Sequence, residues 1–272
     1  MMTVPMKSPR STPWAAAGGA TASAGLRLFC LPFAGGGSAA YRGWRGRFGG
    51  DVDVIPITLP GREMRFAEPA YRALAPLVDA MADGLASLLD RPYALFGYSM
   101  GALIAHRLAD RLAAGEAGEP AHLFAAAHRA PQLARRLEPI HDLPSDAFWH
   151  RLGQYNSMPS PVLENRELRD LLEPVLRADF AVVETAGPPP ARRLSCPVTA
   201  IGGSLDRFVD AAALQAWAAV TTGSFECLTM AGGHFFINEV GDALIDAVVE
   251  ALRPAAYPRS QERSGAEGAD VS

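Results

Sequence analysis

The sequence predicts an α/β fold in which a mostly parallel central sheet is flanked by helices. The first observation is a series of short apolar runs, typical of buried strands, separated by longer stretches with helical spacing of apolar residues. The second is that strands and helices alternate along most of the chain, an order that favours parallel pairing with helices on the sheet faces. We expect strands at residues 26–31, 52–59, 93–96, 121–127, 197–201 and 225–230.

The expected helices lie between these strands. Residues 71–89 carry one broad apolar stripe at a spacing of three and four residues, which predicts an amphipathic helix. The same periodicity predicts helices at 102–114 and 211–220. A closing helix is expected to end at about Leu252.

Residues from about 138 to 190 interrupt the alternation, because this segment is helical and lies between two expected strands. Pro144 and Ser145 open one helix, for which Ser145 is the expected N-cap. A second helix pair is expected within residues 165–185. We therefore expect one domain over residues 25–252 with a helical lid inserted at about 138–190.

The two ends of the chain differ from this domain in composition. Residues 1–24 are rich in Ala, Ser, Thr, Gly and Pro and lack periodicity, so we expect a disordered extension. A signal peptide is the alternative, since Lys7 and Arg10 precede an Ala-rich stretch, but that stretch contains no leucine. Residues 253–272 are polar, and we expect a disordered tail there.

The composition restricts the class of protein. With 272 residues, 49% hydrophobic and 20% charged, the chain is typical of a globular domain. A net charge of −4 gives no support for a nucleic acid or an anionic membrane as partner. No apolar run approaches the ~20 residues of a membrane span. The cysteines are far apart in apolar contexts, so we expect core residues and a reducing cytoplasm: Cys30, Cys196 and Cys227.

One expected strand runs directly into a G-x-S-x-G motif at residues 97–101, and a helical stretch follows. This strand–turn–helix setting is the one in which such a motif forms a nucleophile elbow, so Ser99 is the candidate nucleophile. Gly97 and Gly101 lack Cβ atoms, which allows strand and helix to pack closely. The N–H of Met100 then lies at the helix N-terminus, where it is a candidate oxyanion donor.

A serine nucleophile needs a base, and the base needs an orienting acid. In α/β-hydrolases these follow the nucleophile in the order Ser, Asp, His. Asp206 and His234 each follow an expected strand, at the edge of the sheet where Ser99 lies. His128 is the alternative base, although it precedes every candidate acid. Asp210 is the alternative acid, although its position before residue 211 favours a helix cap.

Further candidate residues surround these three. The glycine-rich loop after the first strand is expected to supply a second oxyanion donor, the N–H of Ala34 or alternatively of Phe33. In the lid, aromatic residues either line an acyl pocket or anchor the lid, and Asp179 is expected to be structural. The substrate-binding candidates are Phe33, Tyr98, Phe148, Trp149, Met158 and Phe235, with Tyr155 as a further aromatic residue of the lid. Histidines and cysteines show no metal-ligand spacing, so no metal is expected.

The motifs, taken in order, resemble those of type II (external, editing) thioesterases, which accompany modular polyketide synthases and nonribosomal peptide synthetases. The resemblance covers about residues 26 to 252. Tyr98 stands where that family usually has His, and His128 stands where it tends to have a small residue. The motifs are L-P-F-A-G-G at 31–36, L-P-G-R-E at 59–63, G-Y-S-M-G-A at 97–102, R-A-P at 129–131, L-R-A-D-F at 176–180 and G-G-H-F-F at 232–236.

The resemblance implies a fold and an activity. The fold is that of the α/β-hydrolases, and the activity is hydrolysis of stalled or mis-primed acyl thioesters on the phosphopantetheine arm of carrier proteins, without a cofactor. Arg129, Arg135 and Arg136 are candidate contacts for the acyl or peptidyl carrier protein, or alternatively part of a solvated surface, and a monomer is expected. The alternatives are a general esterase or acyltransferase for small molecules, and a non-catalytic scaffold that binds carrier proteins.

Overall fold

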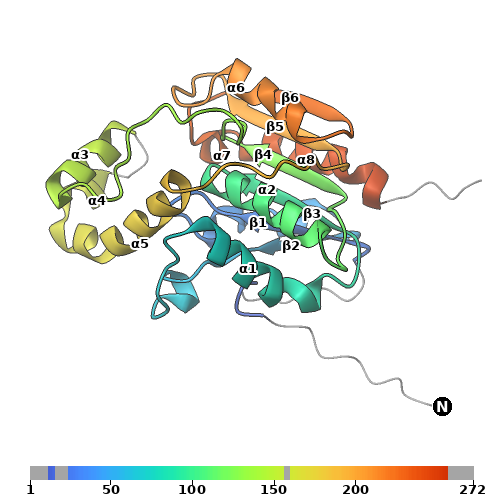
Figure 1. The fold of residues 1–272 in the computed structure, drawn as a ribbon, viewed down its shortest axis with the longest axis horizontal. Helices are drawn as coiled ribbons and strands as arrows, with labels where there is room; N and C mark the ends of the chain where they lie inside the picture. The colour runs from blue at the N-terminus through green and yellow to red at the C-terminus, as the bar shows by residue number, and fades with distance from the viewer. Residues whose placement is uncertain (1–11, 16–23, 156–159, 257–272) are drawn as a thin grey trace, which may run out of the picture.

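A computed structural model describes residues 12–15, 24–155 and 160–256, and six parallel strands form its central sheet (Figure 1). Their order across the sheet is β2-β1-β3-β4-β5-β6, so the α/β fold class is confirmed. The nearly complete burial of the first four strands explains their continuous apolar runs, since both faces of a parallel sheet are covered. The strands are β1 Leu26–Leu31, β2 Val52–Pro56, β3 Tyr93–Tyr98, β4 His122–Ala126, β5 Val198–Gly203 and β6 Phe225–Met230.

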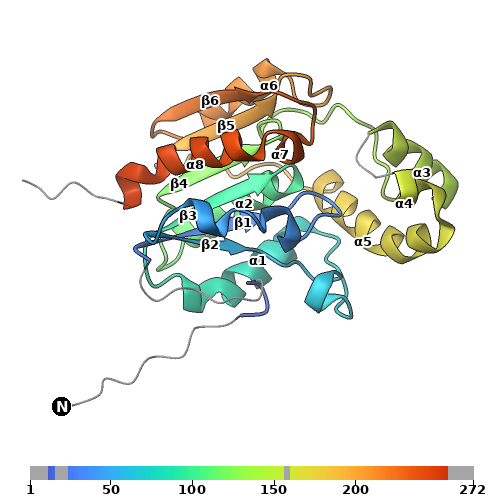
Figure 2. The same cartoon turned by 180° about the vertical axis from the view of Figure 1, so that it is seen from behind.

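Helices cover both faces of the sheet. On one face lie α1 (Leu74–Leu85), α2 (Met100–Ala113) and α6 (Ala211–Gln215), as Figure 1 shows. On the other face lie α7 (Phe236–Glu239) and α8 (Gly241–Ala256), which are in front in Figure 2. Two separate apolar clusters fill these layers. No helix of the described residues is long and apolar enough to cross a membrane.

Two ends of the expected domain differ from the sequence-based prediction. Residues 12–15 belong to the folded domain, whereas we expected the whole of 1–24 to be an extension. Trp14 is buried in the apolar cluster, and its carbonyl accepts a hydrogen bond from Thr58 N at 2.8 Å. Helix α8 continues to Ala256, four residues past the expected end. The expectations for residues 1–11, 16–23 and 257–272 lie outside the described residues.

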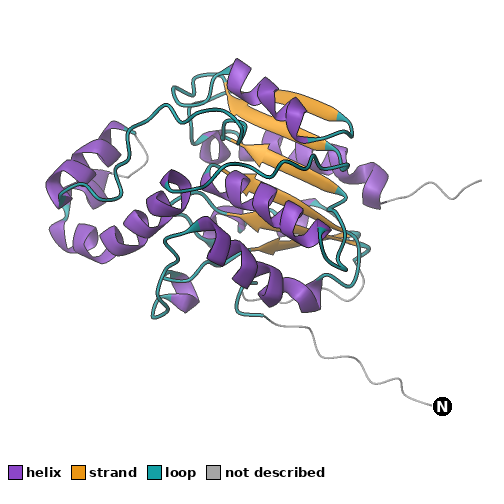
Figure 3. Ribbon diagram, viewed as in Figure 1, coloured by secondary structure: helices purple, strands orange, loops and turns teal. Residues whose placement is uncertain are grey.

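The inserted segment forms a separate helical layer at one end of the sheet (Figure 3). It contains α3 (Ser145–Gln154), α4 (Ser160–Glu164) and α5 (Arg166–Glu184). This layer has an apolar cluster of its own, distinct from the two clusters on the sheet faces: Ile140, Phe148, Trp149, Leu152 and Leu176.

Two details of this lid were predicted wrongly. Pro144, not Ser145, is the N-cap of α3, because the Ser145 hydroxyl instead donates to Glu173 Oε2 at 2.6 Å. Residues 166–184 form one continuous helix instead of a helix pair. Asn165 caps this helix, since its side chain accepts from Leu168 N at 3.1 Å.

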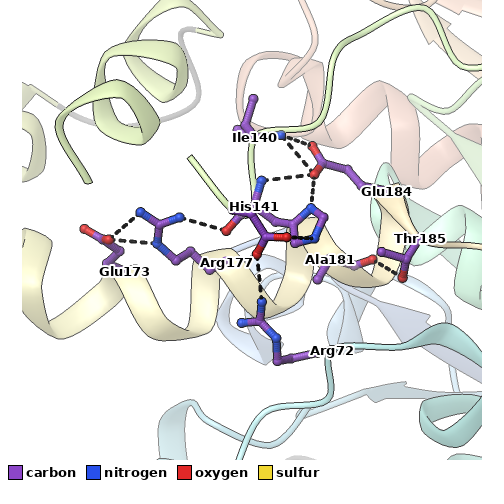
Figure 4. A network of polar contacts seen from close by, with 9 residues as sticks. Arg72, Ile140, His141, Glu173, Arg177, Ala181, Glu184 and Thr185 are labelled. Carbon is purple, nitrogen blue, oxygen red and sulfur yellow. Dashed lines mark hydrogen bonds and ion pairs between the residues drawn. The ribbon is translucent and has the colours of Figure 1, made fainter. Parts of the chain in front are cut away.

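A polar network joins the base of the lid to the C-terminal half of α5 (Figure 4). The Glu184 carboxylate accepts from the backbone N–H of Ile140 at 2.9 Å, and from His141 N and Nδ1 at 3.0 and 2.6 Å. Arg177 donates to the His141 carbonyl at 2.7 Å and also pairs with Glu173. The segment that enters the lid is thereby fixed to the helix that leaves it.

Candidate active site

Ser99 lies on a strained turn between β3 and α2. Its φ of 52° and ψ of −115° are unusual for a residue with a side chain, and its N–H donates to the Ala126 carbonyl at 2.8 Å. The two motif glycines permit this turn. A Cβ on Gly97 would lie 2.2 Å from the Gly101 carbonyl oxygen, and one on Gly101 would lie 2.2 Å from the Leu31 carbonyl oxygen. Only glycine fits at either position.

The structure brings Ser99, His234 and Asp206 together in one chain of hydrogen bonds. His234 Nε2 lies 3.1 Å from Ser99 Oγ, and His234 Nδ1 lies 2.8 Å from Asp206 Oδ2. Because a carboxylate only accepts, Nδ1 carries the proton and the Nε2 lone pair faces the serine hydroxyl. The residues come from the ends of β3, β6 and β5, as expected for parallel strands whose carboxyl ends share one edge.

The Asp206 carboxylate is fully buried and held by its own loop. Its Oδ1 accepts from the backbone N–H of Phe208 at 2.8 Å and of Val209 at 3.3 Å. These bonds leave Oδ2 for His234. The Phe208 ring also stands perpendicular to the imidazole of His234, with ring centroids 5.4 Å apart. Asp206 therefore orients the imidazole in one tautomer and one plane.

Tyr98 was a candidate for substrate binding, but it does not line the cavity. It binds the loop that carries His234 instead. Its side chain points to the opposite face of β3, where the hydroxyl donates to the His234 carbonyl at 2.6 Å. The same oxygen accepts from Ile237 N at 3.3 Å. Burial raises the pKa of Tyr98, so the phenol stays a neutral donor.

The glycine-rich loop after β1 offers few free N–H groups. Gly36 N donates to the Phe33 carbonyl at 2.9 Å, and Gly35 N donates to Asp179 Oδ2 at 2.7 Å. Within the described parts of the chain, the N–H groups of Phe33, Ala34 and Met100 have no acceptor. The candidates for oxyanion donors therefore remain Ala34, or alternatively Phe33, together with Met100 at the start of α2.

A buried ion pair fixes this loop to the lid. Arg62 Nη2 donates to Asp179 Oδ1 at 2.6 Å, and Arg62 Nη1 donates to Asp179 Oδ2 at 2.9 Å and to the Gly36 carbonyl at 2.8 Å. Both side chains are at least 90% buried. Asp179 is thus structural, as expected, but it also anchors the backbone beside Ala34, a connection that sequence reasoning missed.

Ser99 lies on the wall of a cavity of about 830 Å³ between the sheet edge and the lid. Of the predicted site residues, the wall includes Phe33, Ala34, Ser99, Met100, His234 and Phe235. Asp206 lies behind His234. Tyr155, a lid aromatic for which the sequence left open a place in the pocket, lines the cavity. The rest of the apolar wall comes chiefly from residues that the sequence did not single out for the pocket: Leu152, Leu176, Phe180, Val183 and Phe208. Of these residues, Phe208 was the one that the sequence could have indicated, because it follows the candidate acid Asp206 by two residues.

Two predicted pocket residues lie elsewhere. Phe148 is fully buried in the lid's own cluster, and Trp149 packs there too while its indole N–H donates to Glu173 Oε2 at 2.6 Å. Helix α3 turns these aromatic side chains toward α5, away from the cavity. Met158 lies outside the described residues.

The alternatives from the sequence have other contacts. Asp210 caps α6 by accepting from Ala213 N at 2.8 Å, as expected, and pairs with Arg136. Arg135 donates to the Glu184 carbonyl at 3.0 Å. Arg129 and His128 line the cavity, and His128 Nδ1 lies 2.6 Å from the Arg129 carbonyl oxygen. No cluster of three or more potential metal-ligating side chains occurs within the described ranges.

A doubly covered parallel sheet, a serine on a strained elbow and a histidine–aspartate pair together define a serine hydrolase with the α/β-hydrolase fold. The chain belongs to the thioesterase family, because the thioesterase domain model matches residues 26–255. The resemblance that the motifs indicated is therefore confirmed, and the enzyme is a hydrolase acting on thioesters.

Individual relatives agree with this assignment. The chain is 35% identical to the gramicidin S biosynthesis protein GrsT of Aneurinibacillus migulanus over 90% of this chain and 96% of that protein. It is similar to the structure of the RedJ thioesterase from the prodiginine pathway of Streptomyces coelicolor, with a TM-score of 0.78, 35% identity and coverage of 92% and 90%. The type II thioesterase BorB from the borrelidin cluster gives a TM-score of 0.81, 31% identity and coverage of 90% and 100%.

Proposed function

We propose that this enzyme removes stalled or mis-primed acyl groups from the phosphopantetheine arm of carrier proteins in polyketide or nonribosomal peptide synthesis. The observation that carries the proposal is the hydrogen-bonded chain from Ser99 through His234 to Asp206 on the wall of a large cavity. Support also comes from relatives named for the biosynthesis of gramicidin S, prodiginine and borrelidin.

The first half of the reaction transfers the acyl group to the serine. Ser99 Oγ attacks the thioester carbonyl carbon while its proton passes to His234 Nε2. The N–H groups of Ala34 and Met100 stabilise the resulting oxyanion. When the tetrahedral intermediate collapses, the carbon–sulfur bond breaks and the thiol leaves with the proton from His234. The charged imidazole is stabilised throughout by Asp206.

The second half of the reaction releases the acid. A water molecule gives a proton to His234 Nε2 and attacks the acyl carbonyl, and the same two N–H groups hold the new oxyanion. Collapse breaks the ester bond, and Ser99 recovers its proton from His234. Every step uses groups of this chain and water, so the proposal requires no cofactor.

The cavity wall is positively charged, which suits the anionic arm of a carrier protein. In its described part the wall holds one acidic side chain, Glu184, and five arginines: Arg107, Arg129, Arg135, Arg136 and Arg207. Of the predicted carrier contacts, Arg135 and Arg136 already bind within the chain, whereas the Arg129 guanidinium makes no hydrogen bond or ion pair to a described residue. That the enzyme is a monomer and works in the cytoplasm stays a prediction from the sequence.

The decisive test compares hydrolysis of acetyl- and propionyl-carrier protein with hydrolysis of the same acyl groups on a small free thiol. We expect higher kcat/KM for the carrier-bound substrates, and loss of turnover in Ser99→Ala. Ser195→Ala is the matched control, because Ser195 is exposed and its hydroxyl donates to Glu119, away from the cavity. A fluorophosphonate probe is expected to label the wild type and not Ser99→Ala.

Other outcomes would point to the alternatives. Equal turnover of carrier-bound and free thioesters would contradict the carrier specificity and favour a general esterase or acyltransferase. Absence of turnover and of labelling in a folded protein that still binds carrier would overturn the catalytic proposal and favour a scaffold.

A further inference from the structure

His128 is a polar residue in the wall of the acyl cavity for which the proposed reaction has no role. It lies two residues after β4, and its backbone is tightly held: the Trp217 indole N–H donates to the His128 carbonyl at 2.8 Å, and Ala127 before it has a φ of 52°. His128 shares the cavity with Ser99 and His234. His128 is therefore fixed at its backbone on the wall of the cavity that contains the reacting serine.

The hydrogen bonding of His128 defines its tautomer. Nδ1 lies 2.6 Å from the backbone carbonyl oxygen of Arg129, and a carbonyl oxygen can only accept, so Nδ1 carries the proton. Burial is the main cause that lowers the pKa of His128 to about 4, while the hydrogen bond to the Arg129 carbonyl acts to raise it and the charges of His234 and Arg129 act to lower it. The ring is neutral at physiological pH, and Nε2 therefore presents an unprotonated lone pair.

This lone pair has no donor in the described structure. Nδ1 uses the single ring proton, and Nε2 makes no hydrogen bond to another described residue. The His128 side chain is half-buried and lines the cavity. The surrounding wall is largely apolar, as at Leu152, Phe180 and Phe208.

An unpaired acceptor in an apolar wall discriminates between acyl groups. A plain alkyl chain that fills the cavity displaces water from Nε2 and leaves the acceptor without a partner, which is unfavourable. An acyl group with a suitably placed donor replaces the lost water bond. Sites with such a buried polar group therefore reject analogues that lack the matching group.

The charge of the wall selects the kind of donor. Five arginines and one glutamate line the described cavity, and the guanidinium groups of two of these arginines, Arg129 and Arg207, make no hydrogen bond or ion pair to a described residue. A protonated amino group on the acyl chain would be repelled by the positive charge of these arginines. A hydroxyl group donates a hydrogen bond without carrying charge.

We propose that His128 is a specificity-determining residue and that the cavity prefers hydroxyacyl groups, whose hydroxyl donates to His128 Nε2. The inference rests on the proposed thioesterase function and deepens it by naming a substrate class. We expect a preference of about 10-fold in kcat/KM over the matching plain acyl group, the range of one hydrogen bond to a buried acceptor.

The test uses thioesters of one small free thiol, so that carrier recognition does not enter. Two matched series place the hydroxyl at different depths: 2-hydroxypropionyl against propionyl and alanyl, and 3-hydroxybutyryl against butyryl and 3-methoxybutyryl. In the wild type we expect the hydroxyacyl substrate to have the highest kcat/KM in at least one series. The methyl ether and the amino compound are expected to have lower kcat/KM than the matching hydroxyacyl substrate.

Variants then assign the preference to the imidazole. In His128→Phe, which keeps a ring but has no acceptor, the ratio of hydroxyacyl to plain acyl kcat/KM is expected to fall to about 1. His128→Gln offers an amide oxygen and is expected to restore part of the ratio. His150→Gln, an exposed lid histidine outside the cavity, is the control and is expected to keep the wild-type ratio.

Three results would overturn the inference. The first is equal kcat/KM within both series in the wild type, the second is an unchanged ratio in His128→Phe, and the third is a preference for the alanyl over the 2-hydroxypropionyl substrate. If His128→Phe does not fold, two measurements still test the inference. They are the kcat/KM of the 3-hydroxybutyryl against the 3-methoxybutyryl substrate in the wild type, and the ratio of hydroxyacyl to plain acyl kcat/KM in His128→Gln. Absence of turnover of every thioester would instead overturn the proposed function itself, and the inference with it.

Discussion

Tyr98 shows how one side chain behind the sheet edge contributes to the site without touching substrate. The family that this chain resembles usually has histidine at this position, and the tyrosine hydroxyl holds the His234 carbonyl at 2.6 Å. The ring also packs against Phe236, with centroids 5.1 Å apart, directly after the His234 loop. Tyr98 is therefore a positioning residue for the proposed base.

Tyr98→Phe is expected to lower kcat while KM changes little, because the loop of His234 loses its anchor while the acyl cavity keeps its wall. The loss of a buried hydrogen bond is expected to lower the free energy of unfolding by about 1–3 kcal/mol. Steady-state kinetics on one thioester and urea denaturation measure both effects. Tyr93→Phe, at the opposite end of β3, is the control, since its hydroxyl donates to the Gly118 carbonyl at 2.7 Å. Equal effects on kcat in both variants would contradict the positioning role.

Among the secondary-structure elements, helix α5 has two roles. Through Leu176 it contributes to the lid's apolar cluster, and through Asp179 it binds the loop that carries the candidate oxyanion donor Ala34. Asp179 and Gly35 are 144 positions apart in the sequence. The lid is therefore connected to the candidate oxyanion hole through one carboxylate.

Asp179→Asn is expected to lower both stability and kcat. The change leaves the buried Arg62 guanidinium without its counterion, which costs about 3–5 kcal/mol for a buried pair. It also weakens the bond to Gly35 N, so the neighbouring N–H of Ala34 is held less firmly. Chemical denaturation and kinetics on a small thioester measure the two effects.

Glu173→Gln is the matched control for this prediction. Glu173 lies on the same helix and pairs with Arg177, but it has no contact with the glycine-rich loop. We expect this variant to lose stability in the lid and to keep kcat on the small thioester. A fall in kcat as large as in Asp179→Asn would show that lid stability alone matters, and would contradict the anchoring role.

Across the whole molecule, buried histidines make stability depend on pH. The pKa of three histidines is lowered to about 4, chiefly by burial: His106 and His122, which are buried, and His128, which is half-buried in the cavity wall. In the unfolded chain the same groups titrate near 6.5. Between these values the unfolded state binds protons that the native state does not, so the free energy of unfolding falls as pH falls. The contribution is fully present above about pH 6.5 and is lost toward pH 4.

Urea denaturation between pH 7 and pH 4.5 is expected to show this decline. His122→Gln, which keeps a polar partner for Thr199, is expected to give a shallower slope because one titrating group is removed. The exposed His150 provides the control, and His150→Gln is expected to keep the wild-type slope. Parallel slopes in wild type and His122→Gln would contradict the assignment to buried histidines.

The strands, the elbow and the order of Ser99, Asp206 and His234 were predictable from the sequence because each depends on local pattern. A strand of a doubly covered parallel sheet needs an unbroken apolar run, and the elbow needs glycines at fixed spacing around the serine. Parallel strands then bring their carboxyl ends to one edge, which is why separate loops meet.

Only the tertiary structure decided which face each side chain presents and what lies against it. The sequence left open whether Phe148 and Trp149 line the pocket or anchor the lid, and the structure packs them inside the lid. Trp14 was expected in a disordered extension but is buried in the core. The bond between Asp179 and Gly35 has no local signal either. The physical reason is that burial and hydrogen bonding depend on segments far apart in the chain, whose contacts form only when the elements pack together.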